Sequence, residues 1–283
     1  MVDKPEKLSP GRKAAFACGD VFGGGAFNIL NFLYPAYAAL TLGLGASLTG
    51  IIVMLSKIWD AVTDPFMGLI SDGTRSRMGK RRVYILAGAP LVLVSMVLLF
   101  FPWNISSTAL RFTAALLSYM FFATVETMVM IPYYSLSSEI SSDYTERAKA
   151  NTLRIGFSVA SSIVCVAVPN LIVNAVGQPS GYIVMSVAFG LLFALTLTVT
   201  ALWAKEEVVS PPVRAKFSFK EFVKPLRCKS FRGYMGMQVC AGTTMAVMSG
   251  VFLFFIFLVV KKGNTHSARG RGAGHWPKAA GGN

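Results

Sequence analysis

Seven segments of this chain are apolar for long enough to cross a lipid bilayer, which takes about 20 residues in a helix. They lie at residues 14–43, 48–71, 83–102, 107–137, 155–176, 181–204 and 231–260. Because lipid cannot satisfy an unpaired backbone amide, each span should be helical. With 54% hydrophobic and only 14% charged residues, the composition is too apolar for a soluble domain. We therefore expect an all-α integral membrane protein: a six-helix bundle followed by a seventh transmembrane helix.

The basic residues indicate the direction in which these spans cross the membrane. Twenty Lys and Arg residues fall in segments that would share one side with the N-terminus, and through the sixth span only Arg111 falls on the other. Such an excess is typical of the cytoplasmic side. We expect a cytoplasmic N-terminus and a location in the plasma (inner) membrane. Because the net charge of +14 resides in these loop clusters, we expect contact with membrane lipid and no binding of nucleic acid.

These segments give the expected organisation. Residues 1–13 form a cytoplasmic N-terminus, 14–204 the six-helix bundle, 205–230 a cytoplasmic central loop and 231–260 the seventh helix. The central loop is either a plain linker or a segment lying on the anionic inner leaflet, because its phenylalanines are interleaved with basic residues. The tail, 261–283, places five basic residues on the outer side, against the bias of the rest. We expect this tail to be disordered and interpret it as an aberrant, truncated or frame-shifted end.

Several charged side chains lie within the spans. A rise of about 1.5 Å per residue puts Asp20 and Asp64 roughly 9 to 10 Å from the cytoplasmic ends of their helices. The same rise puts Asp60, Glu126 and Thr127 roughly 15 to 17 Å from those ends. Four carboxylates and one hydroxyl, from three helices, would thus share one layer of the membrane.

The second span suggests a cation site. Asp60 and Asp64 are four residues apart and share a helix face with Lys57. One ammonium against two carboxylates leaves an excess of negative charge, and each intramembrane charge costs at least about 2.5 to 3.5 kcal/mol. Oxygen ligands suit a hard cation such as sodium, or the carboxylates could take a proton. The alternative is a buried ion pair between Lys57 and Asp60, with Asp64 reached by water.

Three other charged residues lie in or beside the spans. Asp20 lies near a helix start, where it could serve only as a cap or reach the interface. Glu126 lies near mid-membrane with no basic residue nearby on its own helix. Arg154, which opens the fifth span, is either an interfacial anchor or the ionic partner of Glu126.

Four stretches together resemble a known family. They are KIWDAVTDP, then GLISDGTRSRMGKRR, IPYYSL and ERAKANTLR. In this order and spacing they are similar to the glycoside, pentoside and hexuronide cation symporters, the melibiose permease family of the major facilitator superfamily. The resemblance runs from about residue 10 to 260. It implies twelve helices in two six-helix halves with the solute between them, of which this chain would hold one half and one further helix.

The resemblance implies roles for individual residues. Asp60, Asp64 and Thr127 match the family's cation-binding positions, with Asp60 and Asp64 as the sodium ligands, and Lys57 and Arg154 match basic positions. The loop between the second and third spans looks like the superfamily's conformational latch, although its charge could also serve only to orient the helices. Its residues are Asp72, Arg75, Arg77, Gly79, Lys80, Arg81 and Arg82.

The sequence departs from the family at the sugar site. Gly24 and Met130 occupy the positions where the best-known member has two sugar-binding aspartates, so a galactoside held by such a pair is not expected. Asp20 and Glu126 lie four residues earlier on the same faces, but their helices run in opposite directions, so they are not a shifted copy of that site. Aromatic residues could stack on a sugar ring or serve only for packing; they are Tyr133, Tyr134, Tyr34 and Trp59.

These observations predict a symporter that couples sodium or protons to a small polar solute, a sugar or glycoside, by alternating access. Neither a cofactor nor enzymatic activity is expected. The alternatives are a non-transporting fragment of such a carrier, which would need a missing C-terminal half as its partner, or a related carrier for a non-sugar solute.

Overall fold

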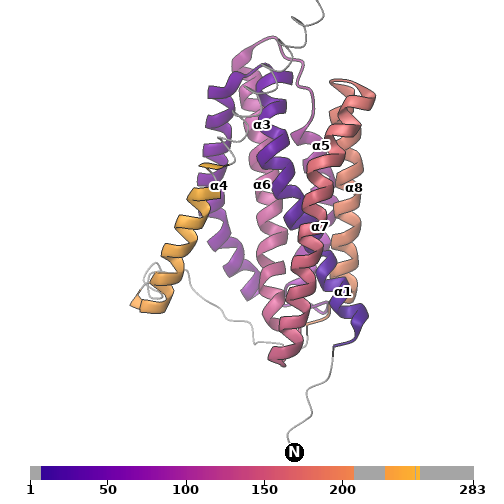
Figure 1. The fold of residues 1–283 in the computed structure, drawn as a ribbon, viewed down its shortest axis with the longest axis vertical. Helices are drawn as coiled ribbons and strands as arrows, with labels where there is room; N and C mark the ends of the chain where they lie inside the picture. Colours follow the sequence, from indigo (N-terminus) through magenta and orange to yellow (C-terminus); the bar gives the residue numbers. More distant parts are fainter. Residues whose placement is uncertain (1–7, 207–226, 246, 249–283) are drawn as a thin grey trace, which may run out of the picture. The chain divides into compact units, whose positions relative to one another are not determined.

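The computed structural model describes residues 8–206, 227–245 and 247–248 (Figure 1). Two compact units divide the chain, Met1–Phe217 and Ser218–Asn283. All regular structure in the described part of the first unit is helical, and in the second unit residues 229–245 form a helix. The tail, most of the central loop and most of residues 246–260 of the predicted seventh span lie outside the described residues.

Five long helices make up most of the first unit, and each is long and apolar enough to cross a membrane. They are α4 (Gly45–Gly73), α5 (Arg82–Leu99), α6 (Thr108–Glu139), α7 (Tyr144–Val176) and α8 (Ser180–Trp203). They correspond to the second through sixth predicted spans. Short connections make successive helices antiparallel (Figure 1), although α4 packs against α6 and not against α5. The expected all-α membrane class is thus confirmed.

The first predicted span differs from a single long helix. Residues 10–41 form consecutive segments, none of which is long enough alone to cross a bilayer: α1 (Pro10–Cys18), α2 (Asp20–Asn28), η1 (Ile29–Leu33), α3 (Tyr34–Ala36) and η2 (Tyr37–Thr41). Two of them, η1 and η2, are π-helical turns. A proline in the short α3 segment between them removes a backbone donor. Single π turns inside helices are rare and frequently lie at functional sites.

Helix packing relies on small residues at the crossings, as is usual in membranes. Helix α5 packs against α6 and α8, α4 packs against α6, and α2 packs against α7. A Cβ atom on Gly88 of α5 would come within 2.2 Å of the Val129 side chain on α6. Gly190 of α8 is pressed in the same way against Leu93 of α5. These contacts fix the relative positions of α4, α5 and α6, which carry most of the site residues.

The two ends of the bundle have different chemistry. At the end that holds the start of α1 and the α4–α5 loop, called here the basic end, Lys13 pairs with Glu146 at 2.5 Å and Lys149 pairs with the same carboxylate at 3.0 Å. Asp143 caps the start of helix α7 there, and its side chain accepts a hydrogen bond of 2.8 Å from the Thr145 amide. Helix α6 therefore begins at the opposite end, with Arg111 in its first turn.

Candidate functional site

Helices α4 and α6 enclose a cavity of about 200 Å³, called here the acidic cavity. It brings together residues that lie about sixty positions apart in the sequence. Its walls are Lys57, Asp60, Asp64, Glu126, Thr127, Met130, Ile131 and Tyr134. All three residues of the predicted cation site are in this group, as are three of the predicted solute residues.

Two direct contacts organise the carboxylates of α4. Lys57 Nζ lies 3.0 Å from Asp60 Oδ2, and Thr127 Oγ1 donates a hydrogen bond of 2.8 Å to Asp64 Oδ1. The other oxygen of Asp60, Oδ1, is buried and has no hydrogen-bond partner among the residues that the structure describes. Leaving a buried carboxylate oxygen unpaired is costly, so this atom is a vacant acceptor inside the cavity.

The ion pair between Lys57 and Asp60, which was the alternative to a cation site, does form. It does not neutralise the cavity, because Glu126 and Asp64 add two further carboxyl groups. The Lys57 side chain is 60% exposed whereas that of Asp60 is 20% exposed, so the ammonium lies toward the rim. An exposed ion pair contributes little, and the acidic excess inside the cavity remains.

The donor set fits a hard cation better than a transition metal. Within the described residues, no group of three or more His, Cys, Asp or Glu side chains is arranged to hold a metal ion. What the cavity offers is carboxylate and hydroxyl oxygen from Asp60, Asp64 and Thr127. Oxygen ligands of this kind suit sodium, and the carboxylates alone suit a proton.

Arg154 is neither a plain interfacial anchor nor the ionic partner of Glu126, the two roles expected for it. Its Nε lies 4.0 Å from Asp20 Oδ2, and its guanidinium lies over the ring of Tyr134, 5.5 Å from the centroid. Arg154 is therefore the ionic partner of Asp20 rather than of Glu126. Through Tyr134, which lines the acidic cavity, this pair borders the site without lining it.

Besides Asp20 and Arg154, two further predicted solute residues, Gly24 and Tyr133, lie away from the cavity. A Cβ atom on Gly24 would come within 2.4 Å of Ser158 Oγ and 2.7 Å of the Ser158 carbonyl, so Gly24 is a close packing point between α2 and α7. Tyr133 is fully buried, and its hydroxyl donates a hydrogen bond of 2.8 Å to the carbonyl of Phe16. Both positions therefore serve helix packing: Gly24 faces α7, and Tyr133 faces α1.

The other aromatic candidates also divide. Tyr134 is 48% exposed and lines the cavity, whereas Tyr34 is fully buried in an aromatic cluster and contacts Tyr119 at a centroid distance of 4.7 Å. Trp59 donates a hydrogen bond of 2.9 Å to Thr124. Tyr134 is thus the aromatic side chain best placed to meet a ligand of the cavity.

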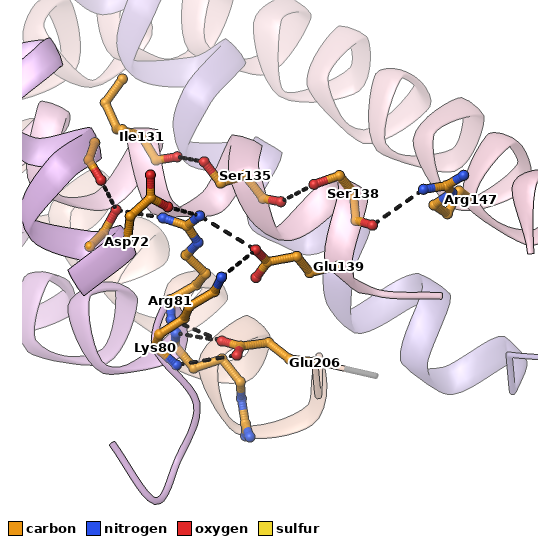
Figure 2. A network of polar contacts seen from close by, with 12 residues as sticks. Asp72, Lys80, Arg81, Ile131, Ser135, Ser138, Glu139, Arg147 and Glu206 are labelled. Atoms are coloured by element: carbon orange, nitrogen blue, oxygen red, sulfur yellow. Dashed lines mark hydrogen bonds and ion pairs between the residues drawn. The ribbon is translucent and has the colours of Figure 1, made fainter. Parts of the chain in front are cut away.

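The predicted latch residues form a network at the basic end (Figure 2). Arg81 is its centre: Nη1 donates to Ser71 Oγ at 2.6 Å, and Nη2 contacts both Asp72 Oδ1 and, at 3.4 Å, Glu139 Oε1. Lys80 Nζ lies 2.8 Å from the same Glu139 oxygen. These contacts tie the end of α4 and the α4–α5 loop to the last turn of α6.

A second carboxylate fixes the start of α5. Glu206, just after α8, accepts hydrogen bonds from the backbone amides of Lys80, Arg81 and Arg82 at 3.2, 2.9 and 3.4 Å. These amides precede or open a helix, so a negative charge there is doubly favourable. Gly79 allows the close approach: its φ is +107°, and a Cβ atom would come within 2.6 Å of Glu206 Oε1.

The remaining basic residues of the loop differ in burial. Arg82 is buried and donates to the carbonyls of Ala201 and Leu202 at the end of α8, at 2.5 and 2.6 Å. Arg75 and Arg77 are exposed. Five of the seven predicted latch residues therefore make tertiary contacts, and these two stay at the surface.

The sequence prediction missed the acidic members of this network. They are Glu139 and Glu206, and each lies two residues after the end of a predicted apolar span. A carboxylate at such a position stands out within a set of basic loops. An isolated acidic residue among basic ones indicates an ion pair, but it does not indicate which basic residue is the partner.

Comparisons with known proteins agree with this architecture. A family model described as MFS/sugar transport protein matches residues 15–269. The chain is similar to a symporter of Synechocystis sp. (31% identical over 227 residues, 75% of this chain and 41% of the relative). It is also similar to the glucuronide carrier protein homolog of Escherichia coli (28% identical; 57% and 35%). A third relative is the sodium-dependent lysophosphatidylcholine symporter 1 of Gallus gallus (28% identical; 62% and 33%).

The chain spans less than half the length of each of these three relatives. All three are named as symporters or carriers, so the comparisons favour transport over enzymatic activity. The family model covers most of the sequence, and the helical bundle has the expected class. The chain is also similar to a putative glycoside/cation symporter of Escherichia coli (26% identical; 88% of this chain and 54% of the relative). The chain belongs to the MFS/sugar transport family, among the glycoside and cation symporters of the major facilitator superfamily.

Proposed function

We propose that the complete carrier represented by this chain is a symporter that couples sodium or a proton to the movement of a small polar solute. The observation that carries the proposal is the buried, unpartnered Oδ1 of Asp60 in a cavity where three carboxyl groups face one ammonium. A small cation would satisfy that oxygen and reduce the repulsion among the carboxylates. The relatives' names, which include a sodium-dependent symporter and a glucuronide carrier homolog, support the same activity.

In this proposal Asp60, Asp64 and Thr127 hold the cation. Thr127 keeps the Asp64 carboxylate in place through its 2.8 Å hydrogen bond, and Lys57 occupies only one oxygen of Asp60. Cation binding between α4 and α6 draws the two helices together at the level of Glu126 and Tyr134. Because linkage is reciprocal, a solute that prefers this arrangement binds more tightly when the cation is present, and the cation binds more tightly with the solute.

The proposed solute is a sugar or glycoside, and Tyr134, Glu126 and Met130 would form the wall that it meets. Tyr134 offers an aromatic face and Glu126 a hydrogen-bonding carboxyl group, the pair of groups that orients a polar ring in a largely apolar pocket. This chain would supply one wall of the solute site, and the opposite wall would come from a second helical bundle.

The basic end supplies the proposed latch. Breaking the contacts of Arg81 with Asp72 and Glu139 would release the end of α4 from α6, which is a two-state change of the kind that alternating access needs. We also propose that this end is cytoplasmic and that the carrier lies in the plasma (inner) membrane, because the basic residues gather there.

The test uses Asp60→Asn and Asp64→Asn in a complete carrier that contains this half. Both variants should lose sodium- or proton-driven uptake of labelled glycosides by at least tenfold, while solute exchange without a cation gradient falls less. Asp143→Asn, at the start of α7, is the matched control for loss of one acidic group. Uptake that keeps its full dependence on the cation gradient in both variants would rule out the proposed cation site.

A second candidate is a carrier of the same mechanism for a non-sugar solute. The similarity to a lysophosphatidylcholine symporter favours including lipids among the solutes tested. Competition for uptake between a glycoside panel and a lysophospholipid panel would distinguish the two, because only the true solute class displaces the label at low concentration.

A further inference from the structure

Asp20 is an acidic residue of the first span that has no role in the proposed transport cycle. Its side chain is 9% exposed, and although it lies in the first turn of α2, that turn has no side-chain cap. Among the described residues, Arg154 of α7 is the one basic side chain within 4.0 Å of it. Ser158, one turn further along α7, also donates a hydrogen bond to the Asp20 carboxylate. The partners of Asp20 therefore lie on α7 and not at its own helix start.

The ion pair holds the Arg154 guanidinium loosely. Its Nε and Asp20 Oδ2 are 4.0 Å apart, which is beyond hydrogen-bond distance. This Nε is buried without a hydrogen-bond partner among the described residues, and the Arg154 side chain is 21% exposed. The guanidinium also lies over the Tyr134 ring, 5.5 Å from its centroid. The charge of Asp20 and the face of Tyr134, rather than a directed hydrogen bond to Nε, thus keep Arg154 in place.

This pair lies directly behind the wall of the acidic cavity. A Cβ atom on Gly23 of α2 would lie 2.6 Å from both Asp20 Oδ1 and Met130 Cε, and 3.5 Å from the Tyr134 hydroxyl. Met130 and Tyr134 line the acidic cavity. A single layer of side chains therefore separates Asp20 from the cavity.

Arg154 has a second acidic group near it. Glu126, Met130 and Tyr134 are spaced four residues apart, so they follow one face of α6. The Tyr134 hydroxyl interacts electrostatically with Glu126 as well as with Asp20 and Arg154. Because the guanidinium already lies over the Tyr134 ring, a change of side-chain rotamer would turn it along this face toward Glu126. A guanidinium in that position would add a second positive charge to the cavity and oppose a bound cation.

We propose that Asp20 is a positioning residue that keeps Arg154 out of the acidic cavity, so that the cavity stays free for an external cation. The inference rests on the proposed cation site. Asp20 holds Arg154, and Lys57 holds one oxygen of Asp60, so the other carboxyl oxygens of the cavity remain for the cation. Without the charge of Asp20, the guanidinium would lack a counterion in a largely buried place and would turn to Glu126. Asp20 thus favours cation binding without contacting the cation.

Sodium binding by the full chain in phosphatidylcholine nanodiscs tests the proposal, measured by calorimetric titration in choline buffer. Asp20→Asn keeps the size of the side chain and an acceptor for Ser158 but removes the charge. It should weaken sodium binding about tenfold, because the released guanidinium competes for the cavity. Adding Arg154→Gln removes the competitor and should restore most of the affinity, which a role of Asp20 in packing alone would not predict.

Three further variants complete this test. Asp20→Glu keeps the charge and should bind sodium nearly as tightly as the parent. Arg154→Gln alone should bind sodium at least as tightly as the parent, because it removes a positive charge beside the cavity. Asp143→Asn, at the start of α7, is the matched control for loss of one acidic group. Thermal unfolding of each variant separates weakened binding from lost folding.

A second measurement needs no sodium, so it decides the positioning of Arg154 even if the proposed cation site is wrong. Thermal unfolding in choline buffer gives the Tm change caused by Glu126→Gln in the parent and in Asp20→Asn. In the parent, Arg154 pairs with Asp20, so Glu126→Gln should shift Tm by no more than about 2 °C. In Asp20→Asn the same substitution should lower Tm by at least about 4 °C, because Arg154 then loses its new partner.

Four results would overturn the proposal. They are unchanged sodium affinity in a folded Asp20→Asn variant, no recovery when Arg154→Gln is added, weaker sodium binding by Arg154→Gln alone, and an equal effect of Glu126→Gln on Tm in both backgrounds. If the parent binds no sodium while the two backgrounds differ in Tm, the proposed cation site is wrong and the positioning of Arg154 by Asp20 stands.

Discussion

Replacing Glu139 by Gln should strongly destabilise the basic end of the bundle. The Glu139 side chain is 9% exposed, and it faces Lys80 at 2.8 Å and Arg81 at 3.4 Å, whose side chains are 10% and 6% exposed. Glutamine keeps the size but removes the charge, so Lys80 would lose its ionic partner in a buried place. Removing one partner of a buried ion pair costs about 3 to 5 kcal/mol.

That cost can be converted into a melting temperature. For a domain of this size, each kcal/mol corresponds to about 2 to 4 °C in Tm, so the loss should be about 6 to 20 °C. The assay is thermal unfolding in nanodiscs, followed by near-UV circular dichroism. Arg77→Gln, which removes one charge from an exposed position of the same network's loop, should shift Tm by no more than about 2 °C.

A double variant tests the reasoning behind that number. Glu139→Gln combined with Lys80→Met removes both members of the closer pair, so no unpaired ammonium stays buried, and most of the lost stability should return. If the double variant is less stable than Glu139→Gln by the full effect of Lys80→Met alone, the two residues are not coupled. The interpretation of the network as a set of mutually dependent charges would then be refuted.

Two further predictions concern the cavity and the helix packing. Thr127→Val should weaken cation binding about tenfold to a hundredfold, because it removes a hydrogen bond of about 1.5 to 3 kcal/mol to the charged Asp64. Thr127→Ser keeps the hydroxyl and should bind the cation nearly as tightly as the parent. Calorimetric titration with sodium and lithium measures both affinities, and equal affinity in the two variants would contradict the role of the hydroxyl. Gly88→Ala should lower the free energy of unfolding by about 1 to 3 kcal/mol, because its methyl group would overlap Val129. The control is Gly156→Ala, whose methyl group would meet nothing within 4 Å. A Tm for Gly88→Ala as high as that of the control would show that the α5–α6 contact can adjust to the added methyl group at little cost.

The sequence was informative where the relevant residues share one helix. Helical spacing alone put Lys57, Asp60 and Asp64 on one face of α4, and the depth estimate put Thr127 and Glu126 at a similar level. The structure brings all five to one cavity, although their role in holding a cation stays a prediction. The family and the all-α class were also predicted correctly, because the apolar spans and the motif order are properties of the chain itself.

Contacts between distant segments could not be predicted in the same way. The partner of Arg154 is Asp20 and not Glu126, because the choice depends on how α7 packs against α2. The same limit applies to Glu139 and Glu206, which bind a loop more than fifty residues earlier in the chain. Spacing within one helix gives direction around its axis, but the crossing of two helices is set by side-chain packing along their whole length.

The two π turns of the first span carry a mechanical consequence. Each holds one more residue than an α-helical turn would, and in an α-helix one residue corresponds to about 100° of rotation about the axis. If η1 or η2 reverted to α geometry, the segment beyond it would swivel by roughly that angle while its backbone amides stayed paired. Such a swivel would carry Thr41 and Leu42 away from Gln178 and Arg111, the residues they now contact. The π turns thus give the first span two points at which it could rotate about its own axis without bending.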